Sequence, residues 1–294
     1  MRTKLFTMLG LTLLFAACSK KDDDTSPDNG NEPTVKDTLY ISSVSSTTND
    51  KGGFNHDSTA FNYNSDKMLK RYVYISFYEY GGGWSGYAYF FHYENKHLKD
   101  LYVNSGGMSD LNTWVADTTG RPQYIVTNVN SRGQVTRMIP ATTEQDFDTL
   151  IYNGQGQLIE KYHISPTIST TLPTTRVTLT YENNNVTKVI EVNNYPGIPT
   201  RTDTTTYKYD NKPNAYWAAA PLVLEQYDSF NYLSANNPVE EVNVYDGYIT
   251  TTTYQYEYND KGYPVSYKTL RKEVDRGSPI ATVNTEYRIT YLPQ

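Results

Sequence analysis

The sequence predicts an all-β protein, a large antiparallel meander of hairpins curved into an open sheet or into a partly or fully closed barrel. Three observations predict it: a hairpin-like unit recurs, the flanking segments alternate with a period of two residues, and tyrosine is abundant, with 29 among 294 residues. Tyr and Thr favour pleated sheets over helices. Eight such units imply roughly 14–18 strands, too many for one flat sheet, because strand twist curls or closes it.

The N-terminus has the parts of an export signal. Arg2 and Lys4 form a short basic region, and residues 5–17 are an apolar run of 13 residues. That length suits the core of a signal peptide and falls short of the roughly 20 residues of a membrane-spanning helix. The run leads into "LFAAC", which resembles the lipobox of bacterial lipoproteins. The resemblance implies that residues 1–17 are removed as a signal peptide and that a lipid is attached to Cys18.

The sequence after Cys18 predicts an anchor at a membrane surface. Lys21, Asp22 and Asp23 resemble the surface-export signal of lipoproteins in anaerobic Gram-negative gut bacteria. A charge run in a solvated tether is the alternative explanation. Residues 18–36 are rich in Asp, Pro, Asn, Gly and Thr, and such a segment cannot bury enough apolar surface to offset its ordering entropy. We expect a lipidated flexible tether on the outer membrane, at the cell surface or, alternatively, on the periplasmic leaflet.

Residues 37–294 are expected to form a single all-β repeat domain, since sandwiches and barrels reach about 250 residues as one domain. Without Arg2 and Lys4, the chain has 24 basic and 32 acidic side chains and a formal charge of −8. This charge argues against nucleic acid as a partner, because nucleic acid needs a basic face. The N-terminal lipid is therefore the expected link to the membrane.

One unit recurs along the chain: an aromatic-rich strand, then Tyr or Val, Asn or Asp, two or three turn residues, and a second strand. Clear copies begin at Phe61, Phe91, Thr127, Leu150, Leu179 and Tyr256, and looser copies begin at Val115 and Tyr207. Asn, Asp and Gly provide the positive φ and the local side-chain hydrogen bonds of tight turns. Each copy is therefore predicted to be a hairpin, and successive hairpins form a meander.

The flanking segments support strands. In residues 248–258 the Tyr and Thr side chains at even positions share one face, and in residues 72–80 the tyrosines alternate with Val, Ile and Phe. Alternation of this kind is the signature of a strand. No stretch after residue 36 has a sustained helical period. Residues 214–227 come nearest, with one or two helical turns expected before Pro221.

The repeat resembles the YD repeats of Rhs-type proteins, in which Tyr-Asp precedes a short turn, a Gly and an aliphatic residue. Tyr209–Asp210 and Tyr258–Asn259 with Gly262 are the nearest matches, although several turns lack the Gly and Val often replaces the first Tyr. Residues 115–294, through "YKYDNKPNAYW" and "YLSANNPVEEV", also resemble a family of gut-bacterial lipoprotein domains of unknown function with a porin-like β fold. This resemblance implies a fold and a cellular location but no activity.

A transmembrane barrel is an alternative that the composition disfavours. A lipid-facing band needs strands of about 10 residues with one apolar face. In residues 248–258 that face consists of Tyr and Thr. The chain ends in "YLPQ" and lacks the terminal aromatic residue expected of an assembly signal.

The residues that bind metals are too few and too scattered to predict a metal or cofactor. His92 and His97 flank a predicted turn, and Asp146 and Asp148 lie close in sequence. Neither pair has the further ligands that a zinc or calcium site requires.

No nucleophile or phosphate-binding motif appears either. The glycines of residues 81–84 are not followed by the helix and Lys of a phosphate loop. A glycoside hydrolase needs two carboxylates at a set separation, and Glu225, Glu240 and Glu241 are the candidates. We expect no enzymatic activity, with a glycoside hydrolase as the alternative.

Binding is the better-supported activity. Trp84, Trp114 and Trp217 lie in or beside predicted loops, with Tyr87 and Tyr216 close in sequence. Aromatic faces stack on the apolar faces of sugar rings, and tyrosine hydroxyls add hydrogen bonds. The alternative is that these aromatic side chains build the core of the sheet.

The sequence therefore predicts a surface-anchored lipoprotein that binds an extracellular glycan or another macromolecule. A structural or assembly partner of an outer-membrane protein is the second prediction.

Overall fold

The computed structural model describes residues 39–50, 53–78, 83–106, 122–141, 143, 145–168, 173–224 and 230–293. Several predictions concern residues outside these ranges: the signal peptide, Cys18, Lys21, Asp22, Asp23, the tether, Trp114 and Glu225. They stay predictions.

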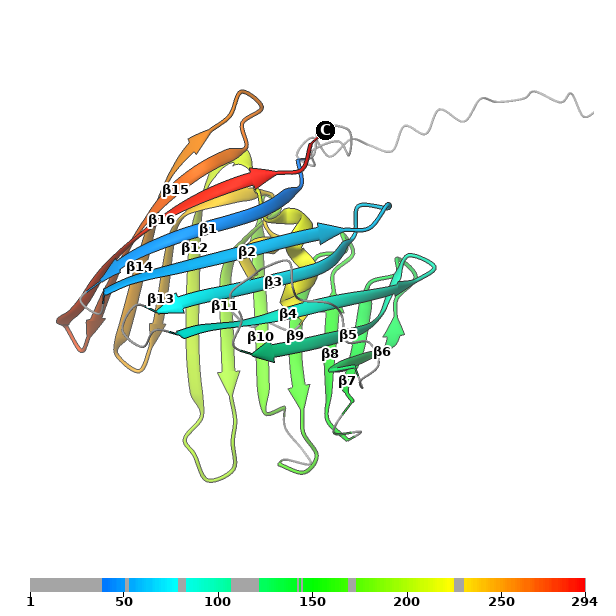
Figure 1. Cartoon of the computed structure of the whole chain (residues 1–294). Coiled ribbons are helices and arrows are strands. Elements are labelled where there is room, and N and C mark those ends of the chain that lie inside the picture. The colour runs from blue at the N-terminus through cyan, green and yellow to red at the C-terminus, as the bar shows by residue number, and fades with distance from the viewer. Residues whose placement is uncertain are drawn as a thin grey trace, which may run out of the picture. The chain divides into compact units, whose positions relative to one another are not determined.

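The described residues form a closed antiparallel barrel of 16 strands, which confirms the predicted all-β fold (Figure 1). Each strand pairs with its neighbours in sequence, and β16 closes the barrel against β1. The strands are β1 (Ile41–Asp50), β2 (Gly53–Tyr63), β3 (Leu69–Tyr78), β4 (Gly83–Glu94), β5 (His97–Gly106), β6 (Tyr124–Val129), β7 (Val135–Pro140), β8 (Phe147–Tyr152), β9 (Leu158–Ile164), β10 (Thr175–Glu182), β11 (Asn185–Asn193), β12 (Arg201–Pro213), β13 (Asn236–Tyr245), β14 (Tyr248–Tyr258), β15 (Pro264–Asp275) and β16 (Ser278–Tyr291).

The six clear copies of the repeat are hairpin turns, and they gather at one end of the barrel, here called the turn end. The turn of the looser copy at Val115 lies outside the described residues. In three of the six turns, an Asn side-chain oxygen accepts hydrogen bonds from the backbone N–H groups two and four residues later, and a Gly with φ of 76° to 87° follows. The Asn and Gly pairs are Asn130 and Gly133, Asn153 and Gly156, and Asn259 and Gly262. Glycine adopts this left-handed conformation without steric cost. The opposite end, which carries the connections β1–β2, β3–β4, β13–β14 and β15–β16, is called the mouth end.

A bulge accompanies the Tyr or Val position of the repeat. The register shifts fall at Tyr63, Tyr93, Val129, Tyr152, Tyr181, Tyr209 and Tyr258. An extra residue in one strand bends the strand and re-aims its side chains. The recurring Tyr therefore marks the point where each strand bends before its turn.

Three of these tyrosines join one hairpin to the previous one. The hydroxyl of Tyr152 donates a hydrogen bond of 2.9 Å to the carbonyl oxygen of Val135, at the start of β7. Equivalent bonds run from Tyr93 to Leu69, from Tyr209 to Val186 and, in the last strand, from Tyr291 to Pro264. Each ring is thereby packed at the turn end while its polar tip is satisfied.

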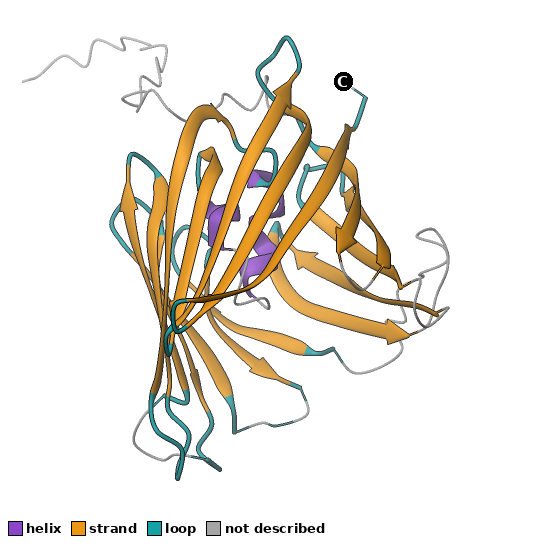
Figure 2. Ribbon diagram, turned by 90° about the vertical axis from the view of Figure 1, so that its left-hand side faces the viewer, coloured by secondary structure: helices purple, strands orange, loops and turns teal. Residues whose placement is uncertain are grey.

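The chain between β12 and β13 enters the lumen of the barrel, where Figure 2 shows it as the helical segment. It contains two 3-10 helices, η2 (Trp217–Leu224) and η3 (Phe230–Leu233). We call residues 214–224 and 230–235 the plug. Its side chains Leu222 and Phe230 are each 1% exposed. Burying such side chains contributes roughly 1.5–3 kcal/mol each, so the plug is a fixed part of the core. In the described part of the chain, no helix has the length and apolarity to cross a membrane.

A buried lysine of the barrel wall holds the end of η2. The Nζ atom of Lys161, in β9, donates hydrogen bonds to the carbonyl oxygens of Leu224 at 2.7 Å and of Val223 at 3.2 Å. The Lys161 side chain is fully buried. A positive charge at the C-terminal end of a helix interacts favourably with its unpaired carbonyl groups.

The plug corrects two expectations. The repeat copy at Tyr207 is no simple hairpin, because Asp210 accepts hydrogen bonds from the backbone N–H groups of both Lys212 and Asn237 and so closes the base of an insertion. The helical segment also runs past Pro221 to Leu224. Burial in the lumen, rather than local periodicity, stabilises it.

The lumen-facing wall carries most of the aromatic residues of the strands. The outer wall is polar on β15 and β16, whereas on β3 and β4 the outward-facing side chains of Val73, Ile75, Ala88 and Phe90 form a small second cluster of buried apolar residues. Tyr267, Thr269, Arg271 and Glu273 of β15 all line the lumen. The residues between them face outward, and Lys268 forms an ion pair of 2.7 Å there with Glu286 of the neighbouring strand. The larger of the two apolar clusters is therefore inside the barrel.

Tyr152 and Tyr181 form a matched pair for testing the hydroxyl bonds. They occupy the same place in their repeats, but the buried hydroxyl of Tyr181 has no hydrogen-bond partner among the described residues. Tyr152→Phe leaves the carbonyl of Val135 without this donor, so we expect a loss of about 1 kcal/mol in the free energy of unfolding. Tyr181→Phe removes an unsatisfied hydroxyl, so we expect no loss or a small gain. Urea denaturation measures both, and equal losses would contradict the assignment.

Candidate functional site

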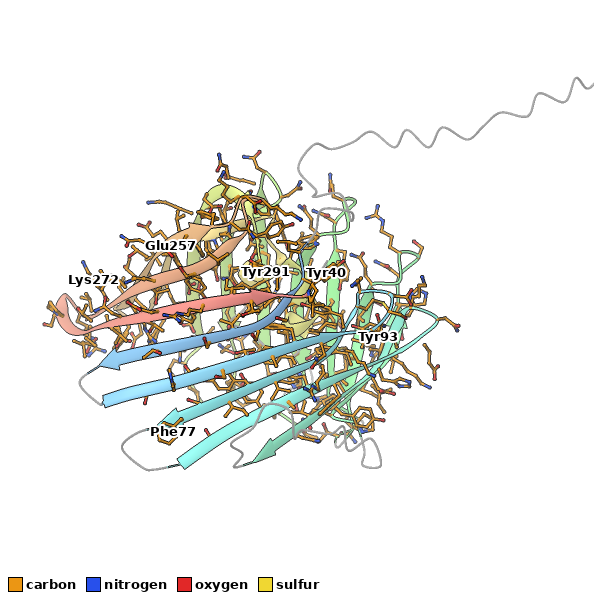
Figure 3. The ribbon with its side chains drawn as sticks, turned by 45° about the horizontal axis from the view of Figure 1, so that its top comes forward. Tyr40, Phe77, Tyr93, Glu257, Lys272 and Tyr291 are labelled. Carbon is orange, nitrogen blue, oxygen red and sulfur yellow. The ribbon has the colours of Figure 1, made fainter. Side chains whose placement is uncertain are left out.

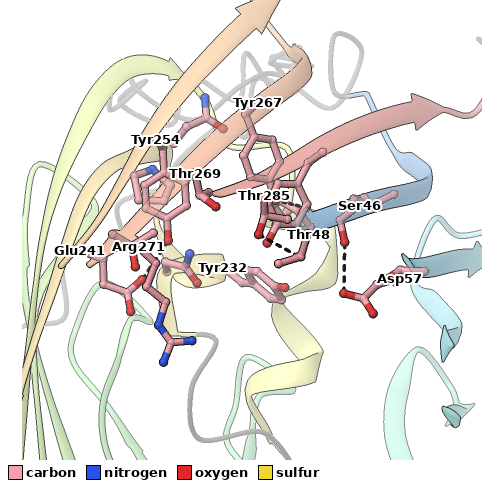
Figure 4. Close-up of a pocket in the computed structure, with 18 of the residues that line it drawn as sticks. Ser46, Thr48, Asp57, Tyr232, Glu241, Tyr254, Tyr267, Thr269, Arg271 and Thr285 are labelled. Atoms are coloured by element: carbon pink, nitrogen blue, oxygen red, sulfur yellow. Dashed lines mark hydrogen bonds between the residues drawn. The ribbon is translucent and has the colours of Figure 1, made fainter. Parts of the chain in front are cut away.

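The lumen contains a cavity of about 910 Å³ between the plug and the mouth end (Figure 4). This lies in the upper part of the range of about 300–1,000 Å³ that is usual for small-molecule sites. Strands β1–β4 and β13–β16 supply the walls, and Tyr216, Asn231 and Tyr232 of the plug supply the floor.

Aromatic side chains cover much of the cavity wall. They are Phe61, Tyr72, Tyr74, Tyr87, Tyr216, Tyr232, Tyr254, Tyr256, Tyr267 and Tyr287. Several are stacked, with ring centroids 4.8 Å apart for Tyr216 and Tyr232 and 4.2 Å apart for Tyr267 and Tyr287. The hydroxyls of Tyr216 and Tyr267 lie 3.0 Å apart and so fix the plug to β15.

Polar groups converge on the same space. Asp57 accepts hydrogen bonds from the hydroxyls of Ser46 at 3.2 Å and Ser76 at 2.5 Å. The hydroxyls of Thr48 and Thr285 lie 2.9 Å apart. A wall of aromatic faces with interspersed hydrogen-bonding groups is the usual construction of a site for a polar organic ligand.

Carboxylates outnumber cations in the lumen. A second cavity of about 330 Å³ shares Glu241, Thr252 and Arg271 with the first. Five carboxylates line the two cavities, those of Asp57, Glu191, Asp203, Glu241 and Glu273. Arg271 is the one cationic side chain that lines either cavity among the described residues. The lumen therefore disfavours anions.

The structure brings two of the predicted ligand-binding residues together. Tyr87 of β4 and Tyr216 of the plug line the same cavity, although 129 positions separate them in the sequence. Trp217 is 41% exposed and lines neither cavity. Trp84 is the second residue of β4, beside the connection from β3. The shared cavity of Tyr87 and Tyr216 arises from the plug, which has no counterpart in the repeat pattern.

Of the three carboxylates named as hydrolase candidates, the two in the described residues, Glu240 and Glu241, are adjacent in β13 and have different surroundings. Glu240 forms an ion pair of 2.7 Å with Lys208, and its neighbour Glu241 lines the lumen, where the hydroxyl of Tyr254 donates to it at 3.1 Å. Sequence reasoning missed Asp57, Arg271 and Glu273. The period-two alternation was the signal for them, since they share a face with the lumen tyrosines.

Two of the four histidines, His92 and His163, are paired with aspartates. The Nδ1 atom of His92 lies 3.1 Å from Asp100, and that of His163 lies 2.7 Å from Asp148. The hydrogen bond to Asp148 raises the pKa of His163, against an opposing effect of burial. In the described ranges, no three His, Cys, Asp or Glu side chains gather as a metal ion requires.

The barrel is similar to solved structures of two proteins described as porin-like. One, from Bacteroides uniformis ATCC 8492, has a TM-score of 0.55 and 14% identity over 86% of this chain and 98% of its own. Another, from Bacteroides vulgatus ATCC 8482, has a TM-score of 0.40 and 12% identity over 87% of this chain and 100% of its own. The first likeness confirms the porin-like β fold and extends to the fold alone. No protein-family model and no curated protein matches the sequence.

The lumen tyrosines predict a cooperative alkaline transition. Burial raises the pKa values of Tyr72, Tyr216, Tyr254 and Tyr267 well above the usual value near 10. The folded state thus favours neutral tyrosine, so this stability is complete below about pH 10 and is lost as the pH rises toward the folded pKa values. As the pH is raised, we expect the increase in tyrosinate absorbance and the loss of the far-UV circular dichroism signal to occur over the same pH range. Ionisation of most tyrosines with the fold intact would contradict the burial.

Proposed function

We propose that the protein is a lipid-anchored lipoprotein of the cell surface that binds an extracellular glycan in the lumen of its barrel. The observation that carries the binding proposal is the cavity of about 910 Å³, where aromatic faces and hydrogen-bonding groups meet above the plug. The signal peptide and the lipid on Cys18 remain inferences from the sequence.

The outer wall supports a barrel that sits in water. Besides the pair formed by Lys268 and Glu286, Arg176 pairs with Glu160 at 2.7 Å and Lys208 pairs with Glu240 at the same distance. Charged groups facing lipid are costly near the bilayer midplane. A lipid anchor then supplies the attachment that the wall does not.

The direction of the cavity fits a tethered receptor. The chain enters the barrel at the turn end, where the ring of Tyr40 packs 5.2 Å from that of Tyr63, and Figure 3 shows Tyr40 and Tyr291 close together there. The cavity reaches Glu273, close to the β15–β16 connection at the mouth end. The start of β1 and the mouth of the cavity thus lie at opposite ends of the barrel.

Two other functions remain as alternatives from the sequence. A partner of an outer-membrane protein would be recovered by crosslinking intact membranes. A hydrolase would release new reducing ends from a glycan that the lumen binds, and we expect none.

Glycan binding is tested with a pair of substitutions. In Tyr87→Ala the cavity loses one aromatic face, and we expect about tenfold weaker binding of a glycan identified on an array, equivalent to about 1.4 kcal/mol. Trp217→Ala removes an exposed ring outside both cavities and is expected to leave affinity unchanged. Isothermal titration calorimetry measures both. The proposal fails if no glycan binds at millimolar concentration, and a larger loss with Trp217→Ala would place the site outside the lumen.

The anchor is tested at Cys18. Cys18→Ala removes the thiol that the lipobox resemblance assigns to the lipid, so metabolic labelling with a fatty acid is expected to mark the unsubstituted chain and not the variant. Protease treatment of intact cells then distinguishes surface display from the periplasmic leaflet. A labelled variant would rule out Cys18 as the lipid site.

A further inference from the structure

Arg271 differs from the other charged residues of the lumen in its position and in its charge. It lies in β15, lines both cavities, and is the one cation among their described lining residues. Its guanidinium pairs with Glu273 at 2.6 Å, and the Arg271 side chain is 54% exposed while that of Glu273 is 17% exposed. The wall therefore holds the carboxylate, and the guanidinium remains accessible from the cavity.

Glu241 adds a second carboxylate at the same place. It also lines both cavities, and it is held in position by the hydroxyl of Tyr254, which donates to Oε2 at 3.1 Å. Figure 4 shows Glu241, Arg271 and Tyr254 beside one another on the wall, with Tyr232 of the plug facing the same space. Two acceptors, one planar donor and two aromatic rings thus share one surface.

This combination suits a particular ligand chemistry. A guanidinium has five N–H donors, and carboxylates have only acceptor oxygens. Neighbouring hydroxyls of a sugar ring both donate and accept, so one can accept from Arg271 while the next donates to Glu241 or Glu273. The ring of Tyr254 offers an apolar face to the same sugar.

The charge of the lumen excludes acidic sugars. Glu273 already neutralises Arg271, and Arg201 likewise pairs with Asp203 at 2.7 Å, while Asp57 and Glu191 add further carboxylates along the two cavities. An additional carboxylate or sulfate would be repelled, more strongly than in water because the enclosed site has a lower dielectric constant.

We propose that Arg271, Glu273 and Glu241 form the specificity-determining subsite of the lumen, and that this subsite selects uncharged sugars through two neighbouring hydroxyls. The inference rests on the proposed glycan binding. It adds the class of glycan that binds and the residues that select this class.

The experiment uses the chain without its first 17 residues, carrying Cys18→Ala. Neutral cello-, manno- and xylo-oligosaccharides and an oligogalacturonate of the same length are the probes, and calorimetry measures their affinities. We expect at least one neutral oligosaccharide to bind at least tenfold more tightly than the oligogalacturonate. Arg271→Gln is expected to weaken that binding at least tenfold, and Glu273→Gln is expected to weaken it less.

Lys272→Gln is the matched control, because Lys272 is the next residue of β15 and is exposed on the outer wall. It is expected to leave affinity unchanged. Circular dichroism and thermal unfolding check that each variant folds. If Arg271→Gln does not fold, Arg271→Lys retains the charge without the planar donor array, and the same tenfold loss is expected.

The outcomes separate the two proposals. If neither the neutral nor the acidic oligosaccharides bind the parent chain, the proposed function fails and the inference fails with it. If a neutral oligosaccharide binds the parent and the Arg271 variant equally, glycan binding stands and the subsite is wrong. Tighter binding of the oligogalacturonate would overturn the charge argument.

Discussion

The structure depends on the inward packing of tyrosine rings. The larger apolar cluster lies in the lumen, where Tyr, Phe and Leu side chains of the strands meet the plug. Tyrosine suits this position because its ring is buried while its hydroxyl still reaches a carbonyl or another hydroxyl. The bonds from Tyr152 to Val135 and from Tyr216 to Tyr267 are examples. The same rings that build the core therefore also line the cavity.

The strands and turns could be predicted because they depend on local rules. Alternation identifies the faces of strands such as β14, and the Asn and Gly positions identify turns such as the one at Asn259. The number of repeats gave the range that includes the 16 strands found. Closure of β16 on β1 is different in kind, since it pairs residues at opposite ends of the domain, such as Thr48 and Thr285.

The plug could not be predicted from the repeat. Tyr209–Asp210 looks like any other corner, and only contacts with Asn237 and Lys212 turn it into the base of an insertion. In the sequence nothing distinguishes Lys161 from the other strand residues, and its role follows only from its hydrogen bond to the end of η2. The cavity could not be predicted for the same reason, because its floor is the plug and its wall combines β2, β4 and β15. Tyr87 and Tyr216 were found from their aromatic character, whereas Arg271 and Glu273 were missed because charged residues on a strand usually face water.

The proposed function depends on both the barrel and the plug. The plug fills the turn-end side of the lumen and leaves a cup at the mouth end. The proposed ligand, an uncharged sugar, has both the apolar ring faces and the hydroxyls that match the aromatic rings and carboxylates of this cup.

Folding without detergent tests the central claim most directly. If the aromatic face is the inner face, the chain without its first 17 residues and carrying Cys18→Ala folds in aqueous buffer, stays monomeric, and unfolds in urea in one cooperative transition that detergent does not shift. A chain that gains its β structure only in micelles or vesicles would show that the outer wall is the apolar one, and the account would be wrong.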